Sequence, residues 1–273
     1  MSYQSPASTT VSENKDQPLL GRSGIVTGAG SGIGRAIARQ LAELGADVGI
    51  NYFMSEEGAK KTRSEVLELG KRASLLRADV SKEYQVGAMV EKFEQEFGRI
   101  DFLVNNAGGD GHANTDSSVE SARLEDWNKI VGANLTGAFL CTHFVAPFML
   151  KAKYGRIVNI SSVCGMTGDC GPAYCSAKAG LLGLTRSSAV SLAPFVQVNA
   201  ILPGFVSSQP HDENLVSRIT PGKRMGTPEE IAELVSYLIS AKGKFLTGAC
   251  IPVDGGLTNG IVGLTMDWIK QRV

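Results

Sequence analysis

The sequence lacks an excess of charge of either sign. Lysine and arginine total 27, aspartate and glutamate also total 27, and the formal net charge is zero. Without a basic excess, overall charge gives no reason to expect binding to nucleic acid or to an anionic membrane. No apolar run reaches the about 20 residues of a membrane span. The 43% hydrophobic and 20% charged residues are ordinary for a soluble globular protein, and we expect a cytoplasmic location without a membrane partner.

Cysteine is also scarce. The five cysteines are an odd number, and residues 1–18 lack the apolar segment of a signal peptide, so we expect reduced thiols in a cytosol. Cys164, Cys170 and Cys175 lie close together in sequence, but no CxxC spacing and no nearby histidine suggests zinc. We therefore expect no metal site and interpret these thiols as packing or pocket-lining residues.

Strand-like and helix-like segments alternate from Ser23 onward. The predicted strands are 25–27, 48–51, 73–77, 100–104, 156–160, 196–202 and 249–253; the predicted helices are 32–44, 56–69, 82–97, 124–149 (one helix or two), 174–193 and 228–240. Such alternation is typical of a parallel sheet covered on both faces. We predict an α/β fold: one doubly wound Rossmann domain at 19–260, with about seven strands. Ligands bind such sheets beyond the carboxyl ends of the strands.

The two ends of the chain differ from this pattern. Residues 1–18 are polar and contain few apolar side chains, which predicts a flexible N-terminal arm. Residues 261–273 form a C-terminal tail with Leu264, Met266, Trp268 and Ile269. Because exposed apolar side chains favour burial, we predict that this tail packs on a neighbouring subunit.

A glycine-rich turn, residues 27–34 (TGAGSGIG), joins the first predicted strand to the first helix. Its glycines allow the backbone to approach a ligand, and the start of the helix offers unpaired N–H groups to an anion. The spacing is TGxxxGxG and not the common GxGxxG. A tight connection alone could account for it, but its place after the first strand favours a dinucleotide.

The segment 161–178 follows the predicted strand 156–160. Tyr174 and Lys178 are four residues apart and would share one face of a helix, with Ser162 shortly before them. A phenol beside an ammonium and a hydroxyl can transfer a proton. An isolated YxxxK pattern more often marks a surface tyrosine and lysine on an ordinary helix. A proton-transfer role for this pair therefore depends on the other motifs.

Together these motifs resemble the short-chain dehydrogenase/reductase family over about residues 20–256. The resemblance is carried by TGxxxGIG at 27–34, NNAG at 105–108, Asn134, the set Ser162, Tyr174 and Lys178, Pro203-Gly204 and, near the end, Asp254-Gly255-Gly256. It implies an NAD(P)-dependent oxidoreductase that interconverts a secondary alcohol and a ketone by hydride transfer. It also implies a homotetramer, or a homodimer, built by the helices at 124–150 and 174–193.

The resemblance further implies residue roles. Tyr174 is the general acid in reduction and the base in oxidation; Lys178 lowers its pKa and holds the nicotinamide ribose. Ser162 orients the substrate oxygen and Asn134 positions a water, although Asn134 could instead serve a backbone group. The implied cofactor contacts are Gly28, Ser31, Gly32, Ile33, Gly34, Asp79, Val80, Asn106, Ala107, Gly108, Tyr174, Lys178, Pro203, Gly204, Val206 and Ser208.

The choice of cofactor depends on the end of the second strand. Asp47 should start that strand, and the end, residues 51–55 (NYFMS), carries no carboxylate to select NAD. No lysine or arginine stands there either; Arg35 is the nearest candidate for a 2′-phosphate. We favour NADP over NAD. Asp79 resembles the family residue at the adenine ring, or it could cap a helix near Ser81.

Two loops should select a small carbonyl or alcohol substrate. They are residues 109–121, where Asp110 and His112 could contact a polar substrate, and residues 207–224, which include His211; His143 is interpreted as structural. Two alternatives remain: a dehydratase or epimerase on the same fold, and a regulator that binds the cofactor without turnover. Binding alone does not require Tyr174, which argues against the regulator.

Overall fold

Seven strands form one sheet in the order β3-β2-β1-β4-β5-β6-β7, and every neighbouring pair is parallel. The computed structural model describes residues 17–109, 118–168, 170–208 and 213–259. The strands are β1 (Ser23–Val26), β2 (Asp47–Tyr52), β3 (Ala73–Arg77), β4 (Phe102–Asn105), β5 (Gly155–Ile160), β6 (Val196–Pro203) and β7 (Cys250–Val253). The predicted doubly wound parallel sheet is confirmed. The proposed arm and tail fall almost entirely outside the described residues.

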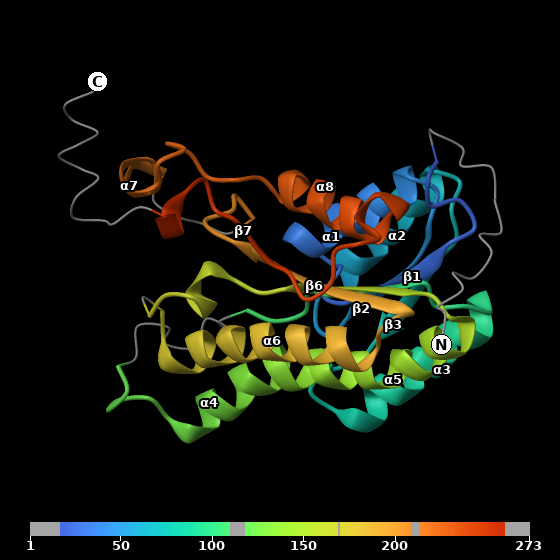
Figure 1. Cartoon of the computed structure of the whole chain (residues 1–273), viewed down its shortest axis with the longest axis horizontal. Coiled ribbons are helices and arrows are strands. Elements are labelled where there is room, and N and C mark those ends of the chain that lie inside the picture. Colours follow the sequence, from blue (N-terminus) through green and yellow to red (C-terminus); the bar gives the residue numbers. More distant parts are fainter. Residues whose placement is uncertain (1–16, 110–117, 169, 209–212, 260–273) are drawn as a thin grey trace, which may run out of the picture.

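Helices cover both faces of the sheet (Figure 1). One layer holds α1 (Gly32–Glu43), α2 (Glu56–Glu68) and α8 (Pro228–Ile239), and the other holds α3 (Glu83–Phe97), α4 (Leu124–Val131), α5 (Gly137–Ala152) and α6 (Pro172–Ser191). A further helix, α7 (Glu213–Ile219), lies in a segment that the sequence predicts as loop. The described residues also contain four short helical turns: η1 (Gly132–Thr136), η2 (Val163–Gly165), η3 (Ala241–Gly243) and η4 (Leu257–Asn259).

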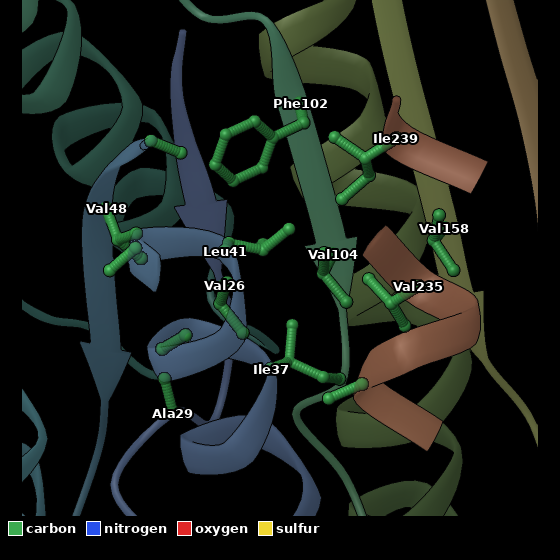
Figure 2. Packing of buried hydrophobic residues seen from close by; sticks show 14 of the residues in the cluster. Val26, Ala29, Ile37, Leu41, Val48, Phe102, Val104, Val158, Val235 and Ile239 are labelled. Atoms are coloured by element: carbon green, nitrogen blue, oxygen red, sulfur yellow. The ribbon is translucent and has the colours of Figure 1, made fainter. Parts of the chain in front are cut away.

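The first core lies between the sheet and the layer of α1 and α8 (Figure 2). Ile37 and Leu41, four residues apart on α1, pack with Val235 of α8 against Val26 and Val104 of the central strands, and all five side chains are completely buried. Burial of each such side chain stabilises the fold by about 1.5–3 kcal/mol. The predicted apolar stripe of the first helix therefore positions the start of α1 against the end of β1.

The second core supports the opposite face. Phe93 of α3 and Met149 of α5 are fully buried there against Ile25, Leu103 and Ile157 of the sheet. With a core on each face, the central strands are covered on both sides, which explains their nearly continuous apolar sequences.

The chain changes direction across the sheet between β1 and β4. From β1 it winds outward through β2 to β3, and then crosses to β4 and winds the other way to β7. Ligand-binding crevices of doubly wound sheets lie at this switch point. Here the carboxyl ends of β1 and β4 place Thr27 and Asn106 at that point.

The segment predicted as one helix or two is one long helix containing a π-helical turn. α4 runs directly through η1, the π turn, into α5. By length and composition alone, Leu124–Ala152 could cross a membrane, but half of its most apolar window is buried inside the protein. A core helix passes the same test, and Met149 and Val145 show that α5 is part of the second core.

Two of the cysteines differ from the expectation of reduced thiols. Cys164 and Cys170 form a disulfide, with Cα atoms 6.1 Å apart. Cys141, Cys175 and Cys250 are free, as expected. The expectation is wrong for the pair because the short loop that carries them folds back on itself, and a separation of six residues in sequence does not reveal that proximity.

Candidate active site

The glycine-rich turn after β1 is held by a side chain of β2 and by one that directly follows β4. The Gly28 amide donates to Asn51 Oδ1 of β2 (3.1 Å), and Asn106 Nδ2 donates to the carbonyls of Thr27 (3.0 Å) and Gly28 (3.2 Å). Thr27 Oγ1 accepts the amides of Asn106 and Ala107, each at 2.9 Å. The turn is thus fixed before any ligand binds.

Close backbone approach explains two of its glycines. Gly28 has φ +62°, which other residues rarely adopt. A Cβ on Gly34 would lie 2.4 Å from both Asn106 Nδ2 and the Gly28 carbonyl oxygen, so no larger residue fits.

The start of α1 opens onto a cavity of about 300 Å³. Ser31, Gly32, Ile33 and Gly34 line it, and Ser31 makes no side-chain capping bond to the helix. The first amides of a helix have no partners within the helix and attract an anion. The first turn of α1 therefore meets the requirement for a phosphate site.

A second cavity, of about 690 Å³, adjoins the first. Gly28 and Gly108 border both cavities, and Asp79 and Val80 line the second. Asp79 Oδ1 accepts the amide (3.0 Å) and the hydroxyl (2.8 Å) of Ser81. Asp79 thus lines the cavity and supports the turn before α3, and its predicted adenine contact stays a prediction.

Arg35, the candidate for a 2′-phosphate, is occupied elsewhere. Its guanidinium pairs with Glu65 of α2, with Nε 2.9 Å from Oε2. The hydrogen bond to this carboxylate raises the pKa of Arg35 and lowers that of Glu65. The ion pair joins α1 to α2 and leaves Arg35 without support as a cofactor ligand.

Ser162, Tyr174 and Lys178 line the same cavity as the glycine turn. Ser162 follows the end of β5, and Tyr174 and Lys178 lie one turn apart on α6. Lys178 Nζ lies 5.5 Å from the centroid of the Tyr174 ring. The fold thus brings the predicted hydroxyl, phenol and amine to the predicted anion site.

Two hydrogen bonds tie α6 to the end of β5. Lys178 Nζ donates to the Ile160 carbonyl, and Ser161 Oγ donates to the Lys178 carbonyl, both at 2.9 Å. Ile160 and Ser161 also line the cavity, although the sequence patterns did not single them out.

Lys178 is buried, with 4% of its surface exposed. Burial disfavours the charged amine and lowers its pKa from 10.5 to about 8. Near neutral pH the amine still carries most of its charge, and it can exchange a proton at modest free-energy cost.

The Ser162 hydroxyl is oriented from one side. Its Oγ accepts the Cys164 amide at 3.2 Å. Because that contact uses an oxygen lone pair, the hydroxyl hydrogen can donate to a ligand in the cavity.

Asn134 lies in the π turn, buried, and binds the chain that borders both cavities. Its Oδ1 accepts the Gly109 amide (3.0 Å), and its Nδ2 donates to the carbonyls of Gly109 (2.8 Å) and Ile130 (2.9 Å). This is the backbone-serving role that the sequence left open. The predicted water-positioning role stays a prediction.

The end of β6 and the residues that follow it also line the first cavity. Pro203, Gly204, Val206 and Ser208 line it, and a Cβ on Gly204 would lie 2.9 Å from the Cα of Asp254. The Asp-Gly-Gly motif thus packs beneath this segment.

The structure also adds Asn51, which sequence reasoning missed. It is buried, and its Nδ2 donates to the carbonyls of Leu76 (3.0 Å) and Ala78 (3.2 Å) while its Oδ1 holds Gly28. A polar residue near the end of an otherwise apolar strand was the available signal.

Of the candidate histidines, only His143 lies within the described residues. Asp110, His112 and His211 lie outside the described residues. His143 lies on α5 between two phenyl rings, 5.9 Å from Phe139 and 5.2 Å from Phe144 by ring centroids. Its interpretation as structural agrees with these contacts.

Comparisons with known proteins match almost the whole chain. A family model described as enoyl-(acyl carrier protein) reductase matches residues 28–258. A 3-oxoacyl-[acyl-carrier-protein] reductase of Synechocystis sp. is 40% identical over 246 residues, covering 88% of this chain and 98% of that protein.

Solved structures agree with this match. A short-chain type dehydrogenase/reductase from Mycobacterium marinum has a TM-score of 0.83 at 32% identity, covering 90% of this chain and 99% of that one. Levodione reductase has a TM-score of 0.82 at 35% identity, covering 89% and 99%. The chain belongs to the short-chain dehydrogenase/reductase family, NAD(P)-dependent oxidoreductases acting on a CH–OH group.

Proposed function

We propose that the protein interconverts a ketone and a secondary alcohol by hydride transfer, with Tyr174 exchanging the proton. One observation carries the proposal: a single cavity is lined by the first turn of α1, by Ser162, Tyr174 and Lys178, and by the segment after β6. An anion site, a proton-transfer pair and an oriented hydroxyl in one cavity suit a reaction at an oxygen-bearing carbon.

The residues around the two cavities fit a nicotinamide dinucleotide. No side chain fits at Gly28 or Gly34 of the glycine-rich turn, and the uncapped start of α1 suits a pyrophosphate. Such a cofactor carries the hydride when it is bound. Asp79 and Val80 would lie toward its adenine end, and Tyr174 and Lys178 toward its nicotinamide end.

Side chains of the protein orient the substrate and exchange the proton. Ser162 donates a hydrogen bond to the substrate oxygen and orients it. Tyr174 gives that oxygen a proton in reduction and takes it back in oxidation. The Lys178 ammonium favours the phenolate form of Tyr174 through their electrostatic attraction. Asn134 holds Gly109 and so keeps the edge of the cavity in place.

NADP is the cofactor we favour over NAD. Asn51, Phe53 and Met54 line the second cavity at the end of β2, and none carries a negative charge to repel a 2′-phosphate. Lys82 and Lys129 line the same cavity and could attract it. Arg35 is not part of this argument because it pairs with Glu65.

The substrate is a small molecule with a carbonyl or alcohol group, selected by the loops at 109–121 and 207–224. The similarity to a reductase named for a 3-oxoacyl group makes a 3-oxoacyl thioester one ketone to test. We place the enzyme in the cytoplasm.

We further infer a homotetramer, or a homodimer, that joins through α4, α5 and α6. Phe139 and Leu150 of α5 and Val190 of α6 are exposed, with 48%, 39% and 80% of their surfaces accessible in the single chain. A partner subunit would bury these apolar side chains.

The test is a panel of ketones with NADPH and NADH, and of secondary alcohols with NADP and NAD, followed at the nicotinamide absorbance. We expect turnover with at least one ketone and its alcohol, faster with the phosphorylated cofactor. Cofactor binding with no turnover across the panel would favour a binding protein. Elimination or epimerisation without net nicotinamide oxidation would favour a dehydratase or an epimerase.

A further inference from the structure

A cysteine pair lies between the proposed catalytic residues. Cys164 follows Ser162 by two residues, and Cys170 precedes Tyr174 by four. The two form a disulfide with Cα atoms 6.1 Å apart, within the ordinary range for such a bond. None of the roles assigned above uses this pair.

One end of the disulfide loop contacts Ser162 directly. The Cys164 amide donates to Ser162 Oγ at 3.2 Å. The next residue, Gly165, packs on α6: a Cβ there would lie 2.8 Å from the carbonyl group of Lys178. A shift of Cys164 would therefore change the support of the serine hydroxyl.

The other end contacts the first turn of α6. The Cys170 carbonyl accepts a hydrogen bond from Cys175 Sγ at 3.4 Å, and Cys175 is the residue after Tyr174. The disulfide thus closes a ring of residues whose two ends support Ser162 and the start of the helix that carries Tyr174.

The pair lies where solvent reaches it, as do Cys175 and Cys250, whereas Cys141 is buried. Cys164 and Cys170 are half-buried, and Met166 within their loop is 57% exposed. Cys141 is completely buried, which raises its pKa to about 12, and burial also raises the pKa of Cys250. A small thiol reagent can reach the loop more easily than the core, and thiols of raised pKa react slowly.

We propose that Cys164 and Cys170 are a reversible thiol–disulfide site for small dithiols and disulfides, and that the disulfide form is the better catalyst. The effect on catalysis rests on the proposed function. The structure has the catalytic set assembled with the disulfide closed. Disulfides of cytosolic proteins, where they occur, are commonly of this redox-responsive kind.

The exchange balances with a dithiol as the reductant. One thiolate of the reagent attacks a sulfur of the pair, the protein S–S bond breaks, and the released cysteine thiolate takes a proton. The second thiolate of the reagent displaces the other cysteine and leaves as a cyclic disulfide. The protein gains two electrons and two protons, and the oxidised reagent reverses the reaction.

Opening the ring should affect substrate more than cofactor. It frees the segment beyond Ser162, whereas the glycine turn is held separately by Asn51 and Asn106. We expect reduction to lower kcat/KM for the ketone at least about fivefold, mainly through KM, and to leave cofactor affinity unchanged.

The test places the full-length protein in dithiothreitol buffers of graded oxidised fraction. Alkylation with mass spectrometry counts the thiols at each cysteine, and kcat/KM and cofactor affinity are measured in parallel. The double variant C164S/C170S should have the same kcat/KM as the reduced enzyme, and this value should not change with the buffer. The matched control Cys250→Ser, which removes a half-buried cysteine outside the loop, should respond as the unaltered protein does.

Either of two results would overturn the proposal. In one, Cys164 and Cys170 are alkylated even in the oxidised buffer, so the pair does not form. In the other, the fraction of disulfide changes with the buffer, but kcat/KM stays the same. If no substrate turns over in any buffer, the proposed function fails, but the proposal about the disulfide can still be tested. The thiol count then decides whether the pair forms, and hydrogen exchange of residues 162–175 decides whether it orders the loop.

Discussion

Lys178 Nζ lies 5.5 Å from the centroid of the Tyr174 ring and donates a hydrogen bond of 2.9 Å to the carbonyl of Ile160. The amine is therefore fixed relative to both the phenol and the end of β5. The helix spacing determines the first relationship and the strand end determines the second, so the backbone sets the position of the amine relative to the phenol.

Tyr174→Phe removes only the phenolic hydroxyl. We expect turnover to fall about 10²–10⁴-fold, the range for losing a general acid or base, while cofactor affinity stays nearly unchanged. Steady-state kinetics and fluorescence titration with the nicotinamide cofactor measure the two quantities. Retained activity in this variant would refute the proposed proton donor.

Lys178 makes a pH-dependent contribution to stability in the cofactor-free protein. Its pKa is lowered from 10.5 to about 8, so between these values the unfolded chain binds more protons than the folded one, and the free energy of unfolding rises with pH. The difference between wild type and Lys178→Met should increase by up to about 3 kcal/mol from pH 8 to pH 10.5.

Denaturant unfolding at several pH values checks this expectation. Comparison with Lys178→Met cancels the titration of all other groups. A difference that is flat with pH, or that falls as pH rises, would contradict the depressed pKa.

Phe53→Asp adds a carboxylate at the end of β2 to the second cavity, which Asp79 already lines. Phe53 lines that cavity at the end of β2, so a carboxylate there should repel a 2′-phosphate. We expect the ratio of kcat/KM for NADPH to that for NADH to fall at least about tenfold. Phe53→Asn is the matched control, of the same shape without the charge, and should shift the ratio much less. Equal shifts in both variants would mean that charge at this position does not select the cofactor.

Val190→Glu tests the proposed assembly. Val190 is 80% exposed on α6, and a carboxylate buried there between subunits would destabilise the contact. Analytical ultracentrifugation should show a smaller assembly for this variant than for the unaltered protein. Val119→Glu is the control because Val119 is also 80% exposed but lies outside α5 and α6, and it should leave the assembly unchanged. If both variants keep the mass of the unaltered assembly, α6 is not part of the interface.

Local patterns predicted the elements that carry their own periodicity. The stripe of Ile33, Ile37 and Leu41 predicted α1, and the glycine spacing predicted the turn before it, because both depend on residues near one another in sequence. The pair Tyr174 and Lys178 was predictable for the same reason, once α6 was expected.

Features that depend on the folded arrangement were not predictable in this way. Asn51 supports Gly28 only because β2 pairs with β1, and its other partners follow on β3. Helix α7 has seven residues with only Val216 buried, too few for a periodic stripe. The disulfide depends on how its loop folds back, which no spacing encodes.

The bond from Ser161 Oγ to Lys178, together with the bond from Lys178 Nζ to Ile160, has a consequence for engineering. Both bonds join a residue before the segment 163–171 to Lys178, which follows it, and neither bond uses a residue of that segment. Sequences grafted into that segment should therefore leave Lys178 in place, whereas they should disturb Ser162, whose oxygen accepts the Cys164 amide.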